Sequence, residues 1–246
     1  MGCGFLDGGW PLAFAHRGGA ASARAAGVPE NSLAAFGLAV AAGYRFVETD
    51  VHATADGVPV VVHDATLARV AGVRGRVGGE PVVPALGEVL EAFPAVRFNV
   101  DVKSWPAVGP AVEAVRAAGA QGRVLWASFS DARLAAVRAA AGADAVTSLG
   151  ARSVGRLWAA ARGCGGGSVR LPAAAVAAQV PVSYLAVPVA GRRFVEVAHR
   201  CGLQVHVWTV DDPAVMVRLL GWGVDGIMTD RLEVLRAVLQ RRGLWW

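Results

Sequence analysis

The sequence predicts a single α/β domain over residues 1–246, a (β/α)8 barrel with a small insertion after its second strand. Short apolar runs of strand type alternate with alanine-rich helical segments, and eight such pairs follow one another along the chain. Strands that alternate with helices form parallel sheets, and eight repeats suffice to close such a sheet into a barrel. Polar residues also gather at the ends of several apolar runs, where a barrel of this kind carries its chemistry.

The expected strands are short, and each is followed by a helical segment. The strand-like runs are 12–16, 45–51, 97–103, 123–129, 144–149, 184–189, 204–210 and 225–230. The helical segments are 30–42, 85–93, one ending near 118, 131–141, 154–162, 192–201, 213–220 and 232–242. In the first helix we expect Asn31 or Ser32 as the N-cap and Gly43 as the stop.

Two features of the chain test this fold assignment. Residues 52–84 interrupt the alternation with an Ala-Asp-Gly turn signal, the run Val-Pro-Val-Val-Val and a glycine-rich piece. We therefore expect an insertion there, which leaves the barrel after strand two. An open, doubly wound sheet is the alternative, but the first strand–helix link reads His-Arg-Gly-Gly-Ala and lacks the glycine pattern of a dinucleotide-binding fold.

Composition narrows the partners and the compartment. The net charge is +5, but the arginines are scattered without a basic run or interleaved aromatics, so we expect no nucleic-acid partner. Three cysteines without metal spacing, and an amino terminus without a signal peptide, favour a reducing, cytoplasmic location. The uncharged stretch Leu171–Gly191 is long enough to span a bilayer, but Pro172, Pro181 and Pro188 interrupt it. We expect a loop and a strand there, and no stable membrane insertion.

The second strand carries two acids on one face. Glu48 and Asp50 are two residues apart, so their carboxylates project together while Val47 and Val51 face the other way. Adjacent carboxylates repel each other unless a cation lies between them. The pattern therefore predicts a cation site at the end of this strand.

The third strand adds a further carboxylate. Asn99, Asp101 and Lys103 follow the i, i+2, i+4 pattern and should all face inward. Glu48, Asp50 and Asp101 together are hard oxygen ligands, which suit Mg²⁺ or Ca²⁺. The alternative is a salt-bridge cluster with Arg17 and Lys103, although one carboxylate is then left over.

Two histidines flank this acidic cluster. His16 ends the first strand and His63 follows the run Val-Pro-Val-Val-Val, and imidazoles move protons near neutral pH. We interpret them as an acid and a base. Arg17 and Lys103, the only lysine of the chain, have the chemistry to hold a phosphate. His206, on a strand, is expected to pack in the core. His199, on a helix, is expected to lie on the surface.

Several segments, taken together, resemble one enzyme family. They are His16–Gly18, Pro29–Ser32, Glu48–Arg69, Asn-Val-Asp-Val-Lys at 99–103, Ser-Phe-Ser at 128–130, His-Val-Trp-Thr-Val at 206–210 and the run Gly223–Arg231. In this order they resemble the glycerophosphodiester phosphodiesterases over nearly the whole chain. The resemblance implies a TIM barrel that hydrolyses small-molecule glycerophosphodiesters to sn-glycerol 3-phosphate and an alcohol.

By motif position, the resemblance also implies roles for individual residues. Glu48, Asp50 and Asp101 would be the metal ligands, and His16 and His63 the acid–base pair. The expected substrate contacts are Arg17 and Lys103 at the phosphate, with Trp208 and Phe129 as walls of the glycerol pocket.

The chain departs from the family pattern at one expected ligand and at one residue after the run 206–210. Asp101 stands where the family usually has Glu, and Asp211 where it often has Asn. Two other activities stay open at this point: a lysophospholipase D-like phosphodiesterase acting on lysophospholipids, and a non-catalytic barrel that binds a phosphorylated ligand.

Overall fold

The fold predicted from the sequence is confirmed. The computed structural model describes residues 4–7, 9–64, 83–143, 145–163 and 169–245, and the backbone of 76–77 and 80–81. Eight parallel strands form a ring that closes where β1 pairs with β2 on one side and with β13 on the other. The barrel strands in chain order are β1 (Leu12–His16), β2 (Phe46–Ala53), β6 (Arg97–Val102), β7 (Val124–Ala127), β8 (Val146–Ser148), β9 (Ala175–Pro181), β12 (Gln204–Trp208) and β13 (Gly226–Thr229).

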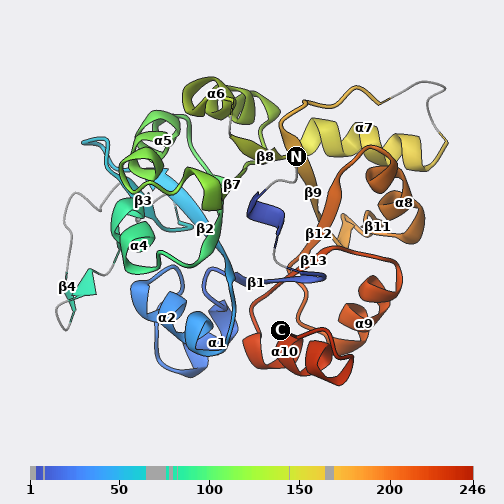
Figure 1. Ribbon diagram of the computed structural model, residues 1–246, viewed down its shortest axis with the longest axis horizontal. Coiled ribbons are helices and arrows are strands. Elements are labelled where there is room, and N and C mark those ends of the chain that lie inside the picture. The colour runs from blue at the N-terminus through green and yellow to red at the C-terminus, as the bar shows by residue number, and fades with distance from the viewer. Residues whose placement is uncertain are drawn as a thin grey trace.

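Helices surround this ring, as Figure 1 shows. They are α1 (Ala20–Ala25), α2 (Leu33–Ala41), α4 (Leu86–Ala92), α5 (Val108–Ala117), α6 (Asp131–Ala141), α7 (Ala151–Ala161), α8 (Arg192–Arg200), α9 (Pro213–Gly221) and α10 (Leu232–Arg241). Local sequence sets their ends: the Ser32 hydroxyl caps α2 by accepting the Ala35 N–H at 3.1 Å, and Gly43 follows it with φ 90°. In the described part of the chain, none of these helices has the length and apolarity that a bilayer span requires.

Short elements fill the connections. The 3-10 helices are η1 (Gly4–Leu6), η2 (Trp105–Ala107) and η3 (Gln121–Arg123), and the minor strands are β3 (Pro59–Val61), β4 (Arg76–Val77), β5 (Glu80–Pro81), β10 (Ser183–Tyr184) and β11 (Val187–Pro188). β3 runs antiparallel to the carboxyl-terminal part of β2, where the predicted insertion begins. Much of the predicted insertion lies outside the described residues.

The predicted position of the sixth barrel strand was wrong. The sixth barrel strand is β9, which was not recognised in the sequence because its alanines have low strand propensity. The expected strand 184–189 is instead the hairpin β10–β11, since Leu185 and Ala186 have positive φ of 46° and 64° and reverse the chain. In addition, α1 precedes the first predicted helix, which begins at Leu33 rather than at residue 30.

Alternation along each strand separates the barrel interior from the layer beneath the helices. Val47 and Val51 of β2 pack outward against the helices, as predicted. The inner apolar layer consists of Phe5, Leu12, Phe14, Phe46, Leu125, Ala177 and Met228. Phe5, from η1, is 1% exposed, and η1 contacts η3, which immediately precedes β7. This apolar layer therefore fills the end of the barrel at which the strands begin, and the polar residues at the strands' carboxyl ends lie at the other end.

Candidate active site

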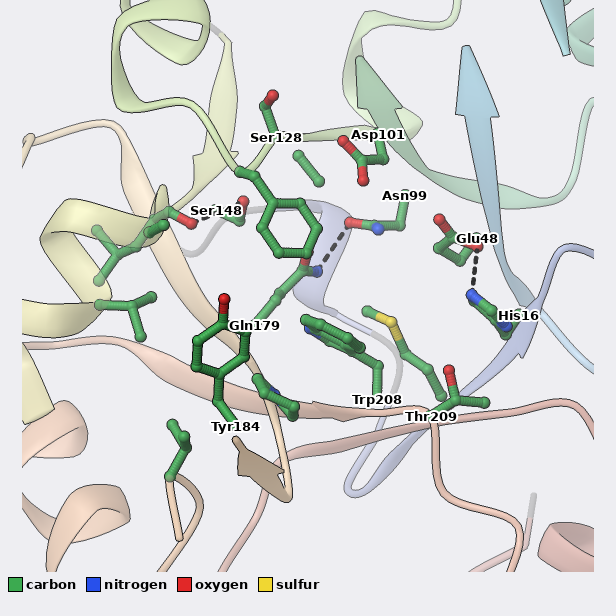
Figure 2. A pocket seen from close by; sticks show the side chains of 18 of the residues that line it. His16, Glu48, Asn99, Asp101, Ser128, Ser148, Gln179, Tyr184, Trp208 and Thr209 are labelled. Atoms are coloured by element: carbon green, nitrogen blue, oxygen red, sulfur yellow. Dashed lines mark hydrogen bonds and ion pairs between the residues drawn. The ribbon is translucent and has the colours of Figure 1, made fainter. Parts of the chain in front are cut away.

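Strand register brings polar side chains together at the carboxyl ends of three neighbouring strands. β1 and β2 pair His16 with Glu48, while β2 and β6 pair Glu48 with Asn99 and Asp50 with Asp101. Residues paired in this way project to the same face of the sheet. His16, Glu48, Asn99 and Asp101 line a cavity of about 670 Å³, and Figure 2 shows them along one of its walls.

The three carboxylates form a buried acidic cluster that faces two cations. One oxygen from each of Glu48, Asp50 and Asp101 lies within 4.8 Å of the others. Lys103 Nζ lies 2.8 Å from Asp50 Oδ1 and 2.5 Å from Asp101 Oδ2. Arg17 Nε lies 3.0 Å from Asp50 Oδ2. The salt-bridge alternative therefore accounts for Asp50 and for one oxygen of Asp101.

Glu48 is in a different electrostatic position from its neighbours. Burial, followed by the charge of Asp50, raises the pKa of Glu48 to about 7. Burial also acts to raise the pKa of Asp50, but the charges of Lys103 and Arg17 outweigh it and lower that pKa. The cluster therefore holds more carboxylate than these two cations stabilise, and another positive charge would favour the ionised form of Glu48.

The donor set fits a divalent cation. Asp101 Oδ1 is buried and, within the described ranges, has no hydrogen-bond partner. An unpartnered carboxylate oxygen is costly to bury, and coordination to a metal would remove that cost. All three residues offer hard oxygen ligands. The buried acidic triad is thus able to bind a metal ion.

His16 is held from both sides of its ring. Its Nδ1 lies 2.7 Å from Asp230 Oδ1, and its Nε2 lies 3.7 Å from Glu48 Oε2. Burial acts to lower the pKa of His16, but the Glu48 charge and the Asp230 hydrogen bond outweigh it and raise that pKa. Asp211 Oδ1 accepts the Asp230 backbone N–H and the Thr229 hydroxyl, both at 2.8 Å. Nδ1 is thereby occupied, and Nε2 is left directed toward the acidic cluster.

The turn after β1 depends on left-handed backbone. Arg17, Gly18 and Gly19 have φ of 51°, 83° and 84°. A Cβ on Gly18 would come 2.9 Å from the backbone carbon of Ala35, so only glycine fits. The turn lets the Arg17 N–H donate to Glu48 Oε2 at 3.2 Å. The strained Arg17 backbone thus helps to place the carboxylate, as strained residues at functional sites often do.

The remaining predicted residues line the same cavity. His63 is exposed at its rim, and the ring of the buried His52 hydrogen-bonds to the His63 backbone. Trp208 and Phe129 meet edge to face with ring centroids 5.6 Å apart, and Lys103 Nζ lies 5.8 Å from the centre of the Phe129 ring. The cavity therefore collects each of the nine predicted site residues except Asp50, which lies buried directly behind Lys103 and Arg17.

Comparison with known proteins identifies this arrangement. The model of the glycerophosphoryl diester phosphodiesterase family matches residues 16–234. The chain belongs to that family. It is 38% identical over 256 residues to a Mycobacterium tuberculosis protein named "Probable glycerophosphodiester phosphodiesterase 2", with 98% of this chain and 95% of the relative covered. The chain is accordingly a glycerophosphodiester phosphodiesterase, a hydrolase of phosphoric diesters.

Solved structures of this family share the fold. A crystal structure from Silicibacter pomeroyi, provisionally assigned as a glycerophosphoryl diester phosphodiesterase, matches with a TM-score of 0.75 and 26% identity over 100% of both chains. An Oleispira antarctica phosphodiesterase matches with a TM-score of 0.68 and 20% identity, over 94% of this chain and 97% of that one. That second protein was solved in complex with its product, sn-glycerol 3-phosphate.

Sequence reasoning missed the residues that hold this phosphodiesterase site in place. Asp230 was included only as part of the run Gly223–Arg231, and its contact with His16 joins the first strand to the end of the last. Asn31 has φ 55° and donates to Asp50 Oδ2 at 3.1 Å, so it is a partner of the cluster rather than the N-cap. Gln179 donates to Asn99 Oδ1 at 2.8 Å. One signal in the sequence could have pointed to such a partner: asparagine occurs only twice in this alanine-rich chain, at Asn31 and Asn99.

Proposed function

We propose that this phosphodiesterase hydrolyses glycerophosphodiesters to sn-glycerol 3-phosphate and an alcohol, with His16 and His63 as its acid–base pair. The observation that carries this assignment is the convergence of His16, Glu48 and Asp101 from three strands in register on one cavity. The product bound by the Oleispira antarctica relative supports the same reaction. Glu48, Asp50 and Asp101 would hold Mg²⁺ or Ca²⁺.

The positive charges at the cluster would stabilise the phosphate in two ways. A bound divalent ion would neutralise phosphate charge and make an oxygen nucleophile more acidic. Lys103 and Arg17 now pair with carboxylates, and both border the cavity, so they are placed to stabilise charge that builds on the phosphoryl oxygens. Their pKa values are raised because neighbouring carboxylates outweigh burial, so both stay cationic.

The two proton transfers of the reaction are assigned to His16 and His63. As the oxygen of a water molecule bonds to phosphorus, one imidazole takes its proton. As the bond between phosphorus and the alcohol oxygen breaks, the other imidazole protonates that oxygen, so one water is consumed overall. His16 exchanges its proton at Nε2, because Asp230 occupies Nδ1. Trp208 and Phe129 form a wall against which the glycerol carbons pack.

Substitution of each histidine tests these roles. His16→Asn and His63→Asn should each reduce kcat on glycerophosphocholine by about 10²–10⁴-fold. His199→Asn is the matched control, since His199 is a half-exposed surface residue on α8 and its loss should leave kcat unchanged. A diester with a p-nitrophenyl leaving group needs no proton donor, so the variant that it rescues identifies the acid. Near-normal turnover in both variants would contradict the assignment.

Metal dependence has its own test. Removal of divalent ions with EDTA should abolish turnover, and Mg²⁺, Ca²⁺ and Mn²⁺ added back separately would identify the preferred ion. Undiminished activity in EDTA would remove the metal from the mechanism.

We also propose a domain organisation and a cellular compartment for the enzyme. Residues 1–246 are taken as one domain that works in a reducing, cytoplasmic compartment, and the free, exposed Cys201 agrees with that compartment. Its partner is the small diester, with no role for nucleic acid.

A further inference from the structure

The cavity extends beyond the residues of the proposed metal and acid–base site. Its lining also includes a group of apolar side chains, here called the apolar arm, which consists of Leu149, Val154, Trp158, Leu185, Val187 and Val189. In Figure 2 Trp208 lies between Tyr184 on one side and His16 and Glu48 on the other. The cavity has a volume of about 670 Å³, which suits a drug-sized ligand. By contrast, sn-glycerol 3-phosphate is a small three-carbon polyol with one phosphate. The apolar arm offers such a polar molecule few contacts.

Two elements build this apolar arm. One wall is α7 and the other is the hairpin β10–β11, which α7 holds in place. The indole N–H of Trp158 donates to the Pro188 carbonyl at 3.1 Å, and the Arg162 guanidinium donates to the same carbonyl at 2.9 Å. Val189 N–H donates to Val182 O at 3.1 Å and closes the base of the hairpin. The arm is thus a built feature of the fold.

The tip of the hairpin is apolar where a turn does not require it. Tyr184, Leu185 and Val187 are 65%, 83% and 45% exposed. Leu185 and Ala186 occupy positive-φ positions that two-residue hairpins usually fill with Asn or Gly. A leucine there is unfavourable both in backbone conformation and in exposure. Turn formation therefore does not explain the residue types, whereas contact with an apolar ligand does.

A positive charge lies beside the hairpin. Between residues 145 and 195 the sequence contains six arginines and neither Asp nor Glu. Arg162, one of the six, lies against the hairpin through its contact with Pro188. Apolar side chains with the Arg162 guanidinium beside them suit an amphiphile whose apolar chain is buried while its anionic group stays near the positive charge.

We propose that the apolar arm binds one alkyl or acyl chain carried by the diester substrate, and that the β10–β11 hairpin is the edge past which this chain enters. The inference rests on the proposed function, because it places the phosphate of the same molecule at the acidic cluster. The chain is attached either to the glycerol or to the leaving alcohol, and the same apolar contacts serve both.

A substrate series tests the proposal. The value of kcat/KM is measured for glycerophosphocholine, for lysophosphatidylcholines with short chains on the glycerol, and for glycerophosphodiesters of hexanol and octanol. Each buried methylene should raise kcat/KM about two- to fourfold until the arm is filled. Whichever chain-bearing series shows this rise identifies the attachment point. Equal kcat/KM for chain-free and chain-bearing diesters in both series would overturn the proposal.

A matched pair of variants assigns the effect to the arm. Val187→Ser alters an arm residue that is 45% exposed, and Val217→Ser alters a residue of α9 that is 42% exposed and is not among those lining the cavity. Val187→Ser should reduce the ratio of chain-bearing to chain-free kcat/KM at least fivefold, and Val217→Ser should leave that ratio unchanged. A ratio that is insensitive to Val187→Ser would also overturn the proposal.

Failure of the inference is separable from failure of the proposed function. Turnover of glycerophosphocholine without any preference for a chain would refute only the apolar arm. If no diester is hydrolysed, the proposed function fails, and the arm is then judged by calorimetry with octyl phosphate and glycerol 3-phosphate. Tighter binding of octyl phosphate that Val187→Ser weakens would support the arm, and equal binding would refute it.

Discussion

Asp230→Asn gives a direct test of how His16 is positioned. The contact between His16 Nδ1 and Asp230 Oδ1 is 2.7 Å long, and the two side chains are only 15% and 26% exposed. A charge-assisted hydrogen bond in such a place contributes about 1.5–3 kcal/mol. Partial exposure favours the lower half of this range. Since about 1.4 kcal/mol corresponds to a tenfold change in rate, kcat should fall roughly 10- to 30-fold.

The assay separates positioning from folding and from substrate binding. Steady-state kinetics with saturating metal should show the loss in kcat while KM stays within about twofold, because Asp230 is not among the cavity-lining residues. Asp225→Asn is the control: it alters a second His–Asp contact of 2.7 Å, with the exposed His199, and should leave kcat unchanged. If Asp230→Asn retains full kcat with an unaltered melting temperature, His16 does not depend on Asp230.

Three further changes have defined outcomes. A Cβ on Gly226 would lie 2.7 Å from the His206 ring and 2.9 Å from Phe14, so Gly226→Ala should lower the free energy of unfolding by about 1–3 kcal/mol, measured by denaturant titration, and an unchanged midpoint would contradict the packing. Burial lowers the pKa of His206 from 6.5 to about 3, so the unfolded chain binds its proton first and stability falls as the pH drops below 6.5. Between pH 7 and pH 5 the wild-type loss should exceed that of His206→Asn by about 2 kcal/mol, and parallel profiles would be inconsistent with a neutral buried histidine. Finally, Asp101→Asn should reduce the increase in melting temperature that Mn²⁺ causes in the wild type, whereas an undiminished increase would exclude Asp101 as a ligand.

The sequence predicts the polar wall of the cavity better than the rest of the cavity, for a physical reason. Glu48, Asp50 and Asp101 lie on regular strands, where the two-residue period alone determines which side chains project together. β9 was missed because its alanines carry little strand propensity, and its interior position is imposed by the neighbours β8 and β12.

Contacts between distant segments could not be predicted from local pattern. Asp230 lies 214 residues from His16 along the chain, and only closure of the barrel makes them neighbours. The apolar arm depends on the hairpin β10–β11 folding back against α7, which no periodicity in the run 184–189 indicates. The glycines of the turn after β1 were noted as part of a motif, while the strained conformation of Arg17 became apparent only in the fold.

The closed register of the strands has a consequence for how the site opens. Glu48 is paired through its backbone with His16 on one side and with Asn99 on the other, so the hydrogen-bond ladder that spaces the proposed site residues also closes the barrel. Amide protons of β2 should therefore exchange with solvent only through global unfolding, whereas those of the β10–β11 hairpin exchange through local opening. Hydrogen exchange would then divide the cavity into a slowly exchanging wall, which carries His16, Glu48 and Asp101, and a faster-exchanging wall formed by the hairpin.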